Sequence, residues 1–129
     1  MSTTLKNNPA NTPEPNPINQ DDNEPVLWDL VIKDFEKMYL GDKNKKAEII
    51  QFMRNRDLFG YTKYSCHLKI NNGRSFINDA LQETGDLVVY TKGLSEENPG
   101  DDLIMEFYKD SLFMLARLYS IKKFMEANG

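Results

Sequence analysis

Three acidic residues are spaced at helical intervals in the segment 76–92. Asp79, Glu83 and Asp86 follow one another at steps of four and three residues, which places their side chains on one side of a helix. Neighbouring carboxylates repel each other, so a positive partner is expected. Hard divalent cations such as Mg²⁺ or Mn²⁺ take carboxylate oxygens as ligands. The spacing therefore predicts either a divalent metal site or a solvated acidic stripe beside the buried face.

Two further features of the sequence bear on a metal-assisted phosphate site. Gly85 lies directly before Asp86, and a glycine inside a helix costs about 1 kcal/mol relative to alanine. Such a cost is expected where another backbone or a ligand comes close. Cations precede the acids in the sequence, at Arg54, Arg56, Lys63 and Arg74. Arg and Lys commonly bind phosphate oxygens beside a metal ion, but each of these cations is equally typical of a solvated surface.

Helices are expected to carry these residues. Apolar side chains recur at three- and four-residue steps through most of the chain after Pro25, which is the period of an amphipathic helix. The expected helices span 25–40, 43 to about 60, 76–92 and a fourth stretch of about 25 residues that opens at Asp101 or Asp102. Residues 60–73 show no long period and could form a loop or a short hairpin. An irregular loop is favoured, because two strands alone would be marginally stable. Four helices with short connections predict an all-α bundle over residues 25–129.

The third expected helix has clear boundaries and a clear apolar side. Ser75 is suited to cap its start, and Gly93 to end it. Pro25 and Gly41 are expected to bound the first helix in the same way. The residues that share the apolar side of 76–92 are Phe76, Ile77, Ala80, Leu81, Thr84, Leu87, Val88 and Thr91.

The first 24 residues differ in composition from the rest. Five of the six prolines lie within the first 25 residues, and large aliphatic side chains are scarce there. Such a segment buries too little apolar surface to offset its chain entropy. We therefore predict a disordered tail over 1–24, with no apolar stretch typical of a secretory signal.

Composition excludes several classes of protein. No run approaches the roughly 18 apolar residues of a membrane-spanning helix, and a net charge of −4 argues against nucleic-acid binding. One cysteine and one histidine allow neither an internal disulfide nor a Cys/His zinc site. Cys66 and His67 are neighbours in the chain, so a structural role is expected for both. These observations predict a cytoplasmic protein without membrane or nucleic-acid partners.

Several blocks of residues resemble a known family. They are Leu27–Asp34, Arg56–Gly60, Lys63–Tyr64, Leu68, Asn72–Arg74, Asp79–Ala80 and Gln82–Tyr90. In these blocks the chain resembles short phage-borne proteins described as dATP/dGTP pyrophosphohydrolases, which are similar to the all-α MazG-like nucleotide pyrophosphohydrolases. The strongest block runs from Asn72 to Tyr90, and the resemblance covers neither the tail nor the fourth helix.

The resemblance implies an oligomeric helical bundle in the cytoplasm of a bacterial host. It implies Mg²⁺- or Mn²⁺-dependent hydrolysis of a nucleoside triphosphate between its α- and β-phosphates. Glu83 and Asp86 match the second acidic motif of the superfamily, Glu-x-x-Asp, and are the implied catalytic metal ligands, with Asp79 a further ligand or an orienting group. The remaining implied roles are phosphate binding by Lys63 and Arg74, and base packing by Tyr64.

The sequence also departs from the family pattern. No Glu-Glu-x-x-Glu occurs, and Gln82 stands where the phage relatives carry an acid. The acids that could substitute on the preceding helices, which lack the required spacing, are Asp34, Glu36 and Glu48. Two alternatives follow: a catalytically inactive relative that serves as a nucleotide-binding or protein-interaction module, and a small helical regulator whose likeness to the phage pattern is coincidental.

Overall fold

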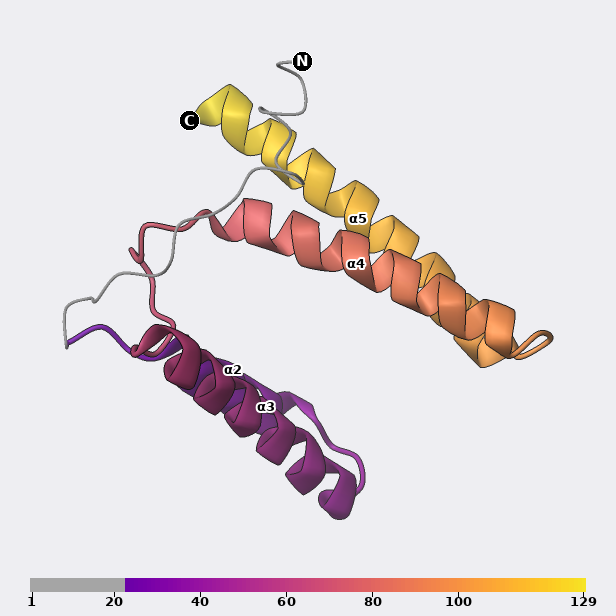
Figure 1. The fold of residues 1–129 in the computed structure, drawn as a ribbon, viewed down its shortest axis with the longest axis horizontal. Coiled ribbons are helices and arrows are strands. Elements are labelled where there is room, and N and C mark those ends of the chain that lie inside the picture. Colours follow the sequence, from indigo (N-terminus) through magenta and orange to yellow (C-terminus); the bar gives the residue numbers. More distant parts are fainter. Residues whose placement is uncertain (1–22) are drawn as a thin grey trace. The chain divides into compact units, whose positions relative to one another are not determined.

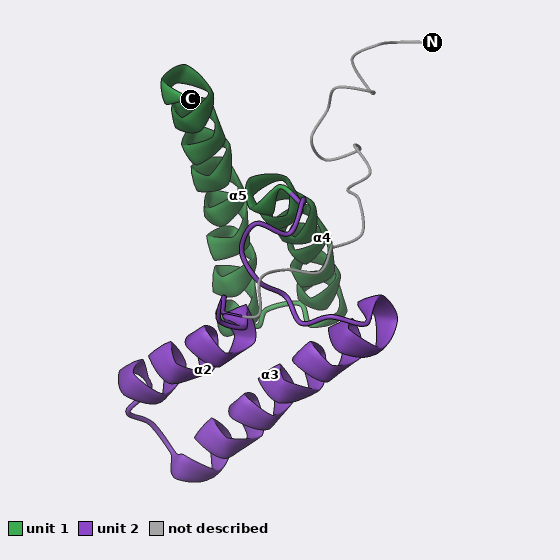
Figure 2. Cartoon of the chain, turned by 90° about the vertical axis from the view of Figure 1, so that its left-hand side faces the viewer, with its two compact units in different colours: residues 1–14, 75–129 green, residues 15–74 purple. Residues whose placement is uncertain are grey.

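The protein is all-α, as its sequence predicts. The computed structural model describes residues 23–129, and within them it contains helices and no strand (Figure 1). The predicted tail lies outside the described residues, apart from Asn23 and Glu24. The helices are α2 (Leu27–Met38), α3 (Lys43–Tyr64), α4 (Phe76–Glu97) and α5 (Asp102–Asn128). They form two compact units, with α2 and α3 in one and α4 and α5 in the other (Figure 2).

Helix α2 is shorter than predicted at both ends. It begins at Leu27 and not at Pro25, because Val26 is still extended and its carbonyl accepts the amide hydrogens of Asp29 and Leu30. At the other end the extended backbone of Tyr39 stops the helix before Gly41. The Tyr39 ring stacks on Phe35 with centroids 5.0 Å apart. Ile32 is the buried side chain of this helix.

Helix α3 is longer than predicted. The Asp42 carboxylate caps its start by accepting two backbone amides, and Lys46 Nζ donates to the Glu36 carbonyl of α2 at 2.8 Å. The predicted end near Gly60 is wrong, since the helix continues to Tyr64. A single glycine inside a helix costs about 1 kcal/mol, which by itself does not end a helix of 22 residues. Ser65, with φ 60°, ends the helix in the left-handed conformation.

The connection from Ser65 to Ser75 is irregular, as predicted for most of its length. The Leu27 amide donates to the Leu68 carbonyl at 2.8 Å, which ties the connection to the start of α2. Positive φ angles at Asn71 and Gly73 turn the chain. The buried Asn72 accepts the Arg74 amide through its side-chain oxygen at 2.9 Å.

Helices α4 and α5 form an antiparallel hairpin (Figure 1). The predicted cap at Ser75 is confirmed, since Ser75 Oγ accepts the Asn78 amide. Helix α5 begins at Asp102, as one of the two expected starts, and Asp101 Oδ1 caps it by accepting the Ile104 amide. The predicted end of α4 at Gly93 is wrong, because the helix runs on to Glu97. The chain then turns at Gly100, whose φ is 85°.

The α4–α5 interface uses small and polar side chains. Its buried residues are Leu81, Thr84, Thr91 and Ser95 on α4 and Ser111 on α5. The predicted apolar side of α4 is therefore largely confirmed, but Phe76 is exposed. Among the residues that the structure describes, the buried hydrophobic side chains are Ile32 and Leu81. Each unit thus leaves most of its apolar side chains accessible to solvent.

Candidate functional site

The three predicted acidic residues lie on α4. Glu83 and Asp86 are exposed, whereas Asp79 is half-buried. Asp79 stands in the first turn of the helix, where a carboxylate interacts favourably with the helix dipole. This position gives Asp79 a structural role that Glu83 and Asp86 do not share. The pair Glu83 and Asp86 is therefore the part of the stripe most open to an external cation.

Gly85 lies between these two exposed carboxylates. A β-carbon built on Gly85 would meet no heavy atom within 4 Å. No close approach among residues 23–129 thus requires a glycine here, and the helix has open space at this position. Alanine would fit at this position without a clash.

The carboxylates of α4 supply only part of the ligand set that a divalent cation needs. Within residues 23–129 the structure contains no group of three His, Cys, Asp or Glu side chains that could hold a metal ion. Mg²⁺ is usually bound through one or two carboxylates together with water and substrate phosphates. Glu83 and Asp86 match that donor type, and they do not by themselves form a complete protein site.

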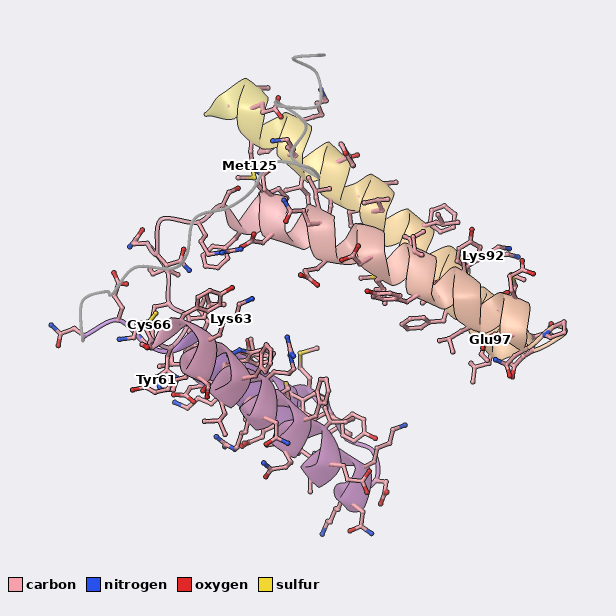
Figure 3. All side chains as sticks on the ribbon, in the orientation of Figure 1. Tyr61, Lys63, Cys66, Lys92, Glu97 and Met125 are labelled. Atoms are coloured by element: carbon pink, nitrogen blue, oxygen red, sulfur yellow. The ribbon has the colours of Figure 1, made fainter. Side chains whose placement is uncertain are left out.

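The predicted phosphate- and base-binding residues belong to the other unit. Lys63 and Tyr64 form the last turn of α3, and Lys63 Nζ lies 5.2 Å from the centre of the Tyr64 ring. Figure 3 labels Lys63 at this end of the helix, near Tyr61 and Cys66. A cation in the last turn also interacts favourably with the helix dipole. The contacts of Lys63 within its own unit thus account for its position.

Arg74 follows at the end of the connection between α3 and α4. Its side chain is half-buried, and its amide is held by Asn72. The possible substitutes for the first acidic motif are also in this unit, with Asp34 and Glu36 on α2 and Glu48 on α3, all three exposed. The predicted site residues are therefore divided between the two units.

A histidine–aspartate pair was not foreseen from the sequence. His67 Nδ1 lies 2.8 Å from Asp57 Oδ1, and the His67 ring lies 4.6 Å from the Tyr61 ring, centre to centre. These contacts fasten the connection after α3 back onto the helix, which accounts for His67 in structural terms. No periodic signal marks the pair, because its members are ten residues apart and one of them lies outside the helix.

A second feature missed from the sequence lies in the α4–α5 unit. Lys122 is half-buried on α5, where its Nζ lies 3.5 Å from Asn78 Oδ1 and 3.3 Å from Glu126 Oε1. This cation reaches across to the first turn of α4, the turn that also carries Asp79. The sequence suggests only an interaction of Lys122 with the dipole of its own helix.

None of the helices described in residues 23–129 combines the length and the apolar character that crossing a membrane requires. Comparison with known proteins found no match: no family model, no curated protein and no solved structure matches the chain.

Proposed function

We propose that this protein is a Mg²⁺- or Mn²⁺-dependent nucleoside triphosphate pyrophosphohydrolase of MazG-like type. Its substrates would be ribo- or deoxyribonucleotides in phage nucleotide metabolism, and it would act as a homo-oligomer in the host cytoplasm. The observation that carries the proposal is the Glu83-x-x-Asp86 pair on α4. Both carboxylates are exposed and one helical turn apart, in a chain whose helical fold agrees with this family.

The proposal assigns a role to each candidate residue. Glu83 and Asp86 would hold the cation, with Asp79 beside them as a further ligand or an orienting group. When bound, such a cation neutralises phosphate charge and makes a neighbouring water molecule more acidic. Lys63 and Arg74 would bind phosphate oxygens, because guanidinium and ammonium groups pair well with them. Tyr64 would pack against the base.

A second candidate function is a catalytically inactive module that binds nucleotides or another protein. Two observations favour it. The sequence lacks a Glu-Glu-x-x-Glu motif, and the described residues hold no three-membered group of potential metal ligands. The two candidates differ on hydrolysis, so a measurement of turnover separates them.

The deciding experiment measures pyrophosphate release from a panel of ribo- and deoxyribonucleoside triphosphates with Mg²⁺ or Mn²⁺. The test variant is Glu83→Gln/Asp86→Asn. A matched control, Glu106→Gln/Asp110→Asn, removes two exposed carboxylates from α5. The enzyme proposal expects activity in the wild type and the control and its loss in the test variant. Absence of turnover with every triphosphate would contradict the enzyme and leave the binding module as the function to pursue.

A further inference from the structure

Positive charge is concentrated on helix α3. Its 22 residues hold six lysines and arginines and two acidic residues. Residues 23–74 as a whole hold ten lysines and arginines and seven acids, whereas residues 75–129 hold five and ten. The net charge of −4 thus averages over an uneven distribution. An argument from net charge therefore does not apply to the surface of α3 by itself.

One exposed side of α3 combines cations with aromatic rings. At about 100° per residue, five exposed residues share an arc of about 60° that no other residue of α3 enters, namely Lys45, Phe52, Arg56, Phe59 and Lys63. The half-buried residues of the helix are centred roughly 95° away, on the side that packs against α2. We call these five exposed residues the α3 row.

Cations and rings alternate along the α3 row. At a rise of about 1.5 Å per residue, the row is about 27 Å long, and its two phenylalanines lie about 10.5 Å apart along the helix axis. The side chains of Phe52 and Phe59 are in residues that are 63% and 57% exposed. The Arg56 guanidinium lies over the Phe59 ring, 4.9 Å from its centre. The row therefore presents flat apolar surfaces between positive charges.

The charges of the α3 row are open to a partner. Within residues 23–129, no ion pair involves Lys45, Arg56 or Lys63. One acid borders the row, because the exposed Glu48 lies about 20° beyond Phe59 around the helix. Three cations thus stand beside one carboxylate, and the row stays positive.

We infer that the α3 row binds a single-stranded nucleic acid. In such complexes Lys and Arg pair with the phosphates, and the unpaired bases stack on aromatic side chains. The row offers both kinds of contact. Bases of a stacked strand are about 3.4 Å apart, so the spacing of the two rings equals about three base steps. The whole row spans about eight nucleotides at the same rise.

An anionic membrane is a poorer fit as the partner. A helix that lies on a bilayer buries a broad apolar side and carries its cations on the opposite, polar side. The α3 row contains no Leu, Ile, Val or Met, and its cations share one narrow arc with the rings. The positions that border the rings on the outer side are polar, at Glu48 and Asn55. These features favour a partner that has both negative charges and flat rings.

Binding can be measured without turnover and without metal. The probe is a fluorescently labelled oligomer of about twelve thymidine nucleotides, a length within the usual range of single-strand sites. The readout is its fluorescence anisotropy with the full chain, in low salt and excess chelator, which removes the Mg²⁺ required at Glu83 and Asp86 by the proposal above. We expect saturable binding. A duplex of equal length should bind about tenfold more weakly, because its bases are already stacked on each other and cannot reach the rings.

The rings are tested by variants that keep an apolar side chain. Phe52→Leu/Phe59→Leu should raise the dissociation constant by about tenfold or more, because leucine offers no flat surface to a base. Phe52→Tyr/Phe59→Tyr keeps both rings and should bind as the wild type does. The matched control, Phe113→Leu/Phe124→Leu, removes two rings from α5 at positions that are 74% and 69% exposed. It should leave the dissociation constant unchanged.

The cations are tested through the salt dependence of binding. Each phosphate contact contributes about 0.7 to the slope of log K against log salt for a single strand, so Lys45→Gln/Arg56→Gln should reduce that slope by about 1.4. The matched control, Lys43→Gln/Arg54→Gln, removes two exposed cations from the same helix, about 200° around from the row, and should keep the slope. Glu48→Gln should strengthen binding, which a damaged fold could not do. Lys63 is left unchanged, since it is also assigned to the triphosphate.

A measurement on the wild type does not depend on any variant. The ring signals of Phe52 and Phe59 in NMR spectra are expected to shift upfield when the oligomer is added, through the ring currents of stacked bases. Several results would each overturn the inference: no binding in low salt, binding of phosphatidylserine vesicles in place of the oligomer, equal or tighter binding of the duplex, or wild-type affinity in Phe52→Leu/Phe59→Leu. Pyrophosphate release is a separate readout, so either proposal can fail without the other.

Discussion

The hydroxyl groups of Thr91 on α4 and Ser111 on α5 lie 3.0 Å apart in the interface of the hairpin. Both residues are buried, at 2% and 1% exposure. Each hydroxyl also reaches a backbone carbonyl of its own helix. Ser111 Oγ donates to Tyr108, and the Thr91 hydroxyl lies within hydrogen-bond distance of the carbonyls of Leu87 and Val88. The contact therefore links the two helices, and each hydroxyl also has a backbone carbonyl of its own helix as a hydrogen-bond partner.

We expect Thr91→Val and Ser111→Ala each to lower the free energy of unfolding by about 1 kcal/mol, the usual net value of one hydrogen bond. The double variant should lose less free energy of unfolding than the two single variants together, because both single variants already remove the same contact between the helices. Urea denaturation of the four proteins gives the coupling energy, expected at about 0.5–1 kcal/mol. A coupling of zero would mean that the two hydroxyls act only on their own helices.

The packing of Leu81 is expected to dominate the stability of the α4–α5 unit. Among the described residues of this unit it is the buried hydrophobic side chain, and truncation of a buried leucine costs about 2–5 kcal/mol. Leu81→Ala should therefore lower the urea midpoint of the hairpin strongly. Phe124→Ala, at an exposed position, is the control and should change it little. Similar effects of both variants would show that Leu81 is not the packing centre.

Ser65 adopts a conformation that glycine tolerates better. Its φ of 60° is in the left-handed region, which costs a residue with a β-carbon about 1–2 kcal/mol. Ser65→Gly should remove this strain, and part of the gain is lost to the greater freedom of glycine in the unfolded chain. We expect a net rise of about 0.5 kcal/mol in the free energy of unfolding. Ser65→Val, which the same backbone tolerates poorly, should lower it.

Ser65 also illustrates a limit in predicting helix ends from the sequence. Helical periodicity located the four helices of residues 23–129, and the cap at Ser75 is confirmed because a hydroxyl group bonds a nearby amide regardless of tertiary structure. Glycine was a poor guide to helix ends. Gly60 and Gly93 are helix-interior, whereas the true stop of α3 is a serine whose positive φ no residue-type preference reveals.

The sequence predicts which candidate residues share one side of a single helix, but it does not predict which residues of different segments lie together. Spacing alone places Glu83 and Asp86 on the same side of α4, and the structure agrees. The pairing of His67 with Asp57 and the reach of Lys122 to Asn78 join different segments, so no local pattern encodes them. Lys63 and Arg74 belong to the other unit, and their roles stay predictions.

The ion pair of Lys92 and Glu96 makes a pH-dependent contribution that can be followed directly. The two side chains lie one turn apart at 2.8 Å. The hydrogen bond from Lys92, reinforced by its charge, lowers the pKa of Glu96 from 4.5, and the same contact raises the pKa of Lys92 from 10.5. The pair therefore stabilises the fold between these two values. Its contribution is lost in acid as Glu96 is protonated and in base as Lys92 is deprotonated.

We expect Lys92→Met to raise the pKa of Glu96 towards its ordinary value, measured from the carboxyl ¹³C shift as a function of pH. Added salt should reduce the difference between wild type and variant, since both groups are exposed to solvent. Lys109→Met removes an exposed lysine from α5 and should leave the Glu96 titration unchanged. An unaltered pKa of Glu96 in Lys92→Met would show that the pair does not persist in solution.

Binding of Mg²⁺ by Glu83 and Asp86 can be tested through stability, without any turnover. A cation that binds only the folded state at ten times its dissociation constant stabilises that state by about 1.4 kcal/mol. We therefore expect Mg²⁺ to raise the melting temperature of the wild type and a chelator to reverse the rise. Glu83→Gln/Asp86→Asn should abolish the response.

The same variant carries an internal check, because two like charges one helical turn apart repel each other by about 0.2–0.5 kcal/mol. Its melting temperature without metal is expected to be slightly above that of the wild type, so loss of the Mg²⁺ response would not reflect a damaged fold. Glu106→Gln/Asp110→Asn removes the same number of exposed carboxylates from α5 and should keep the full response. An equal loss in both variants would mean that Mg²⁺ acts through general screening of the negative charge rather than at α4.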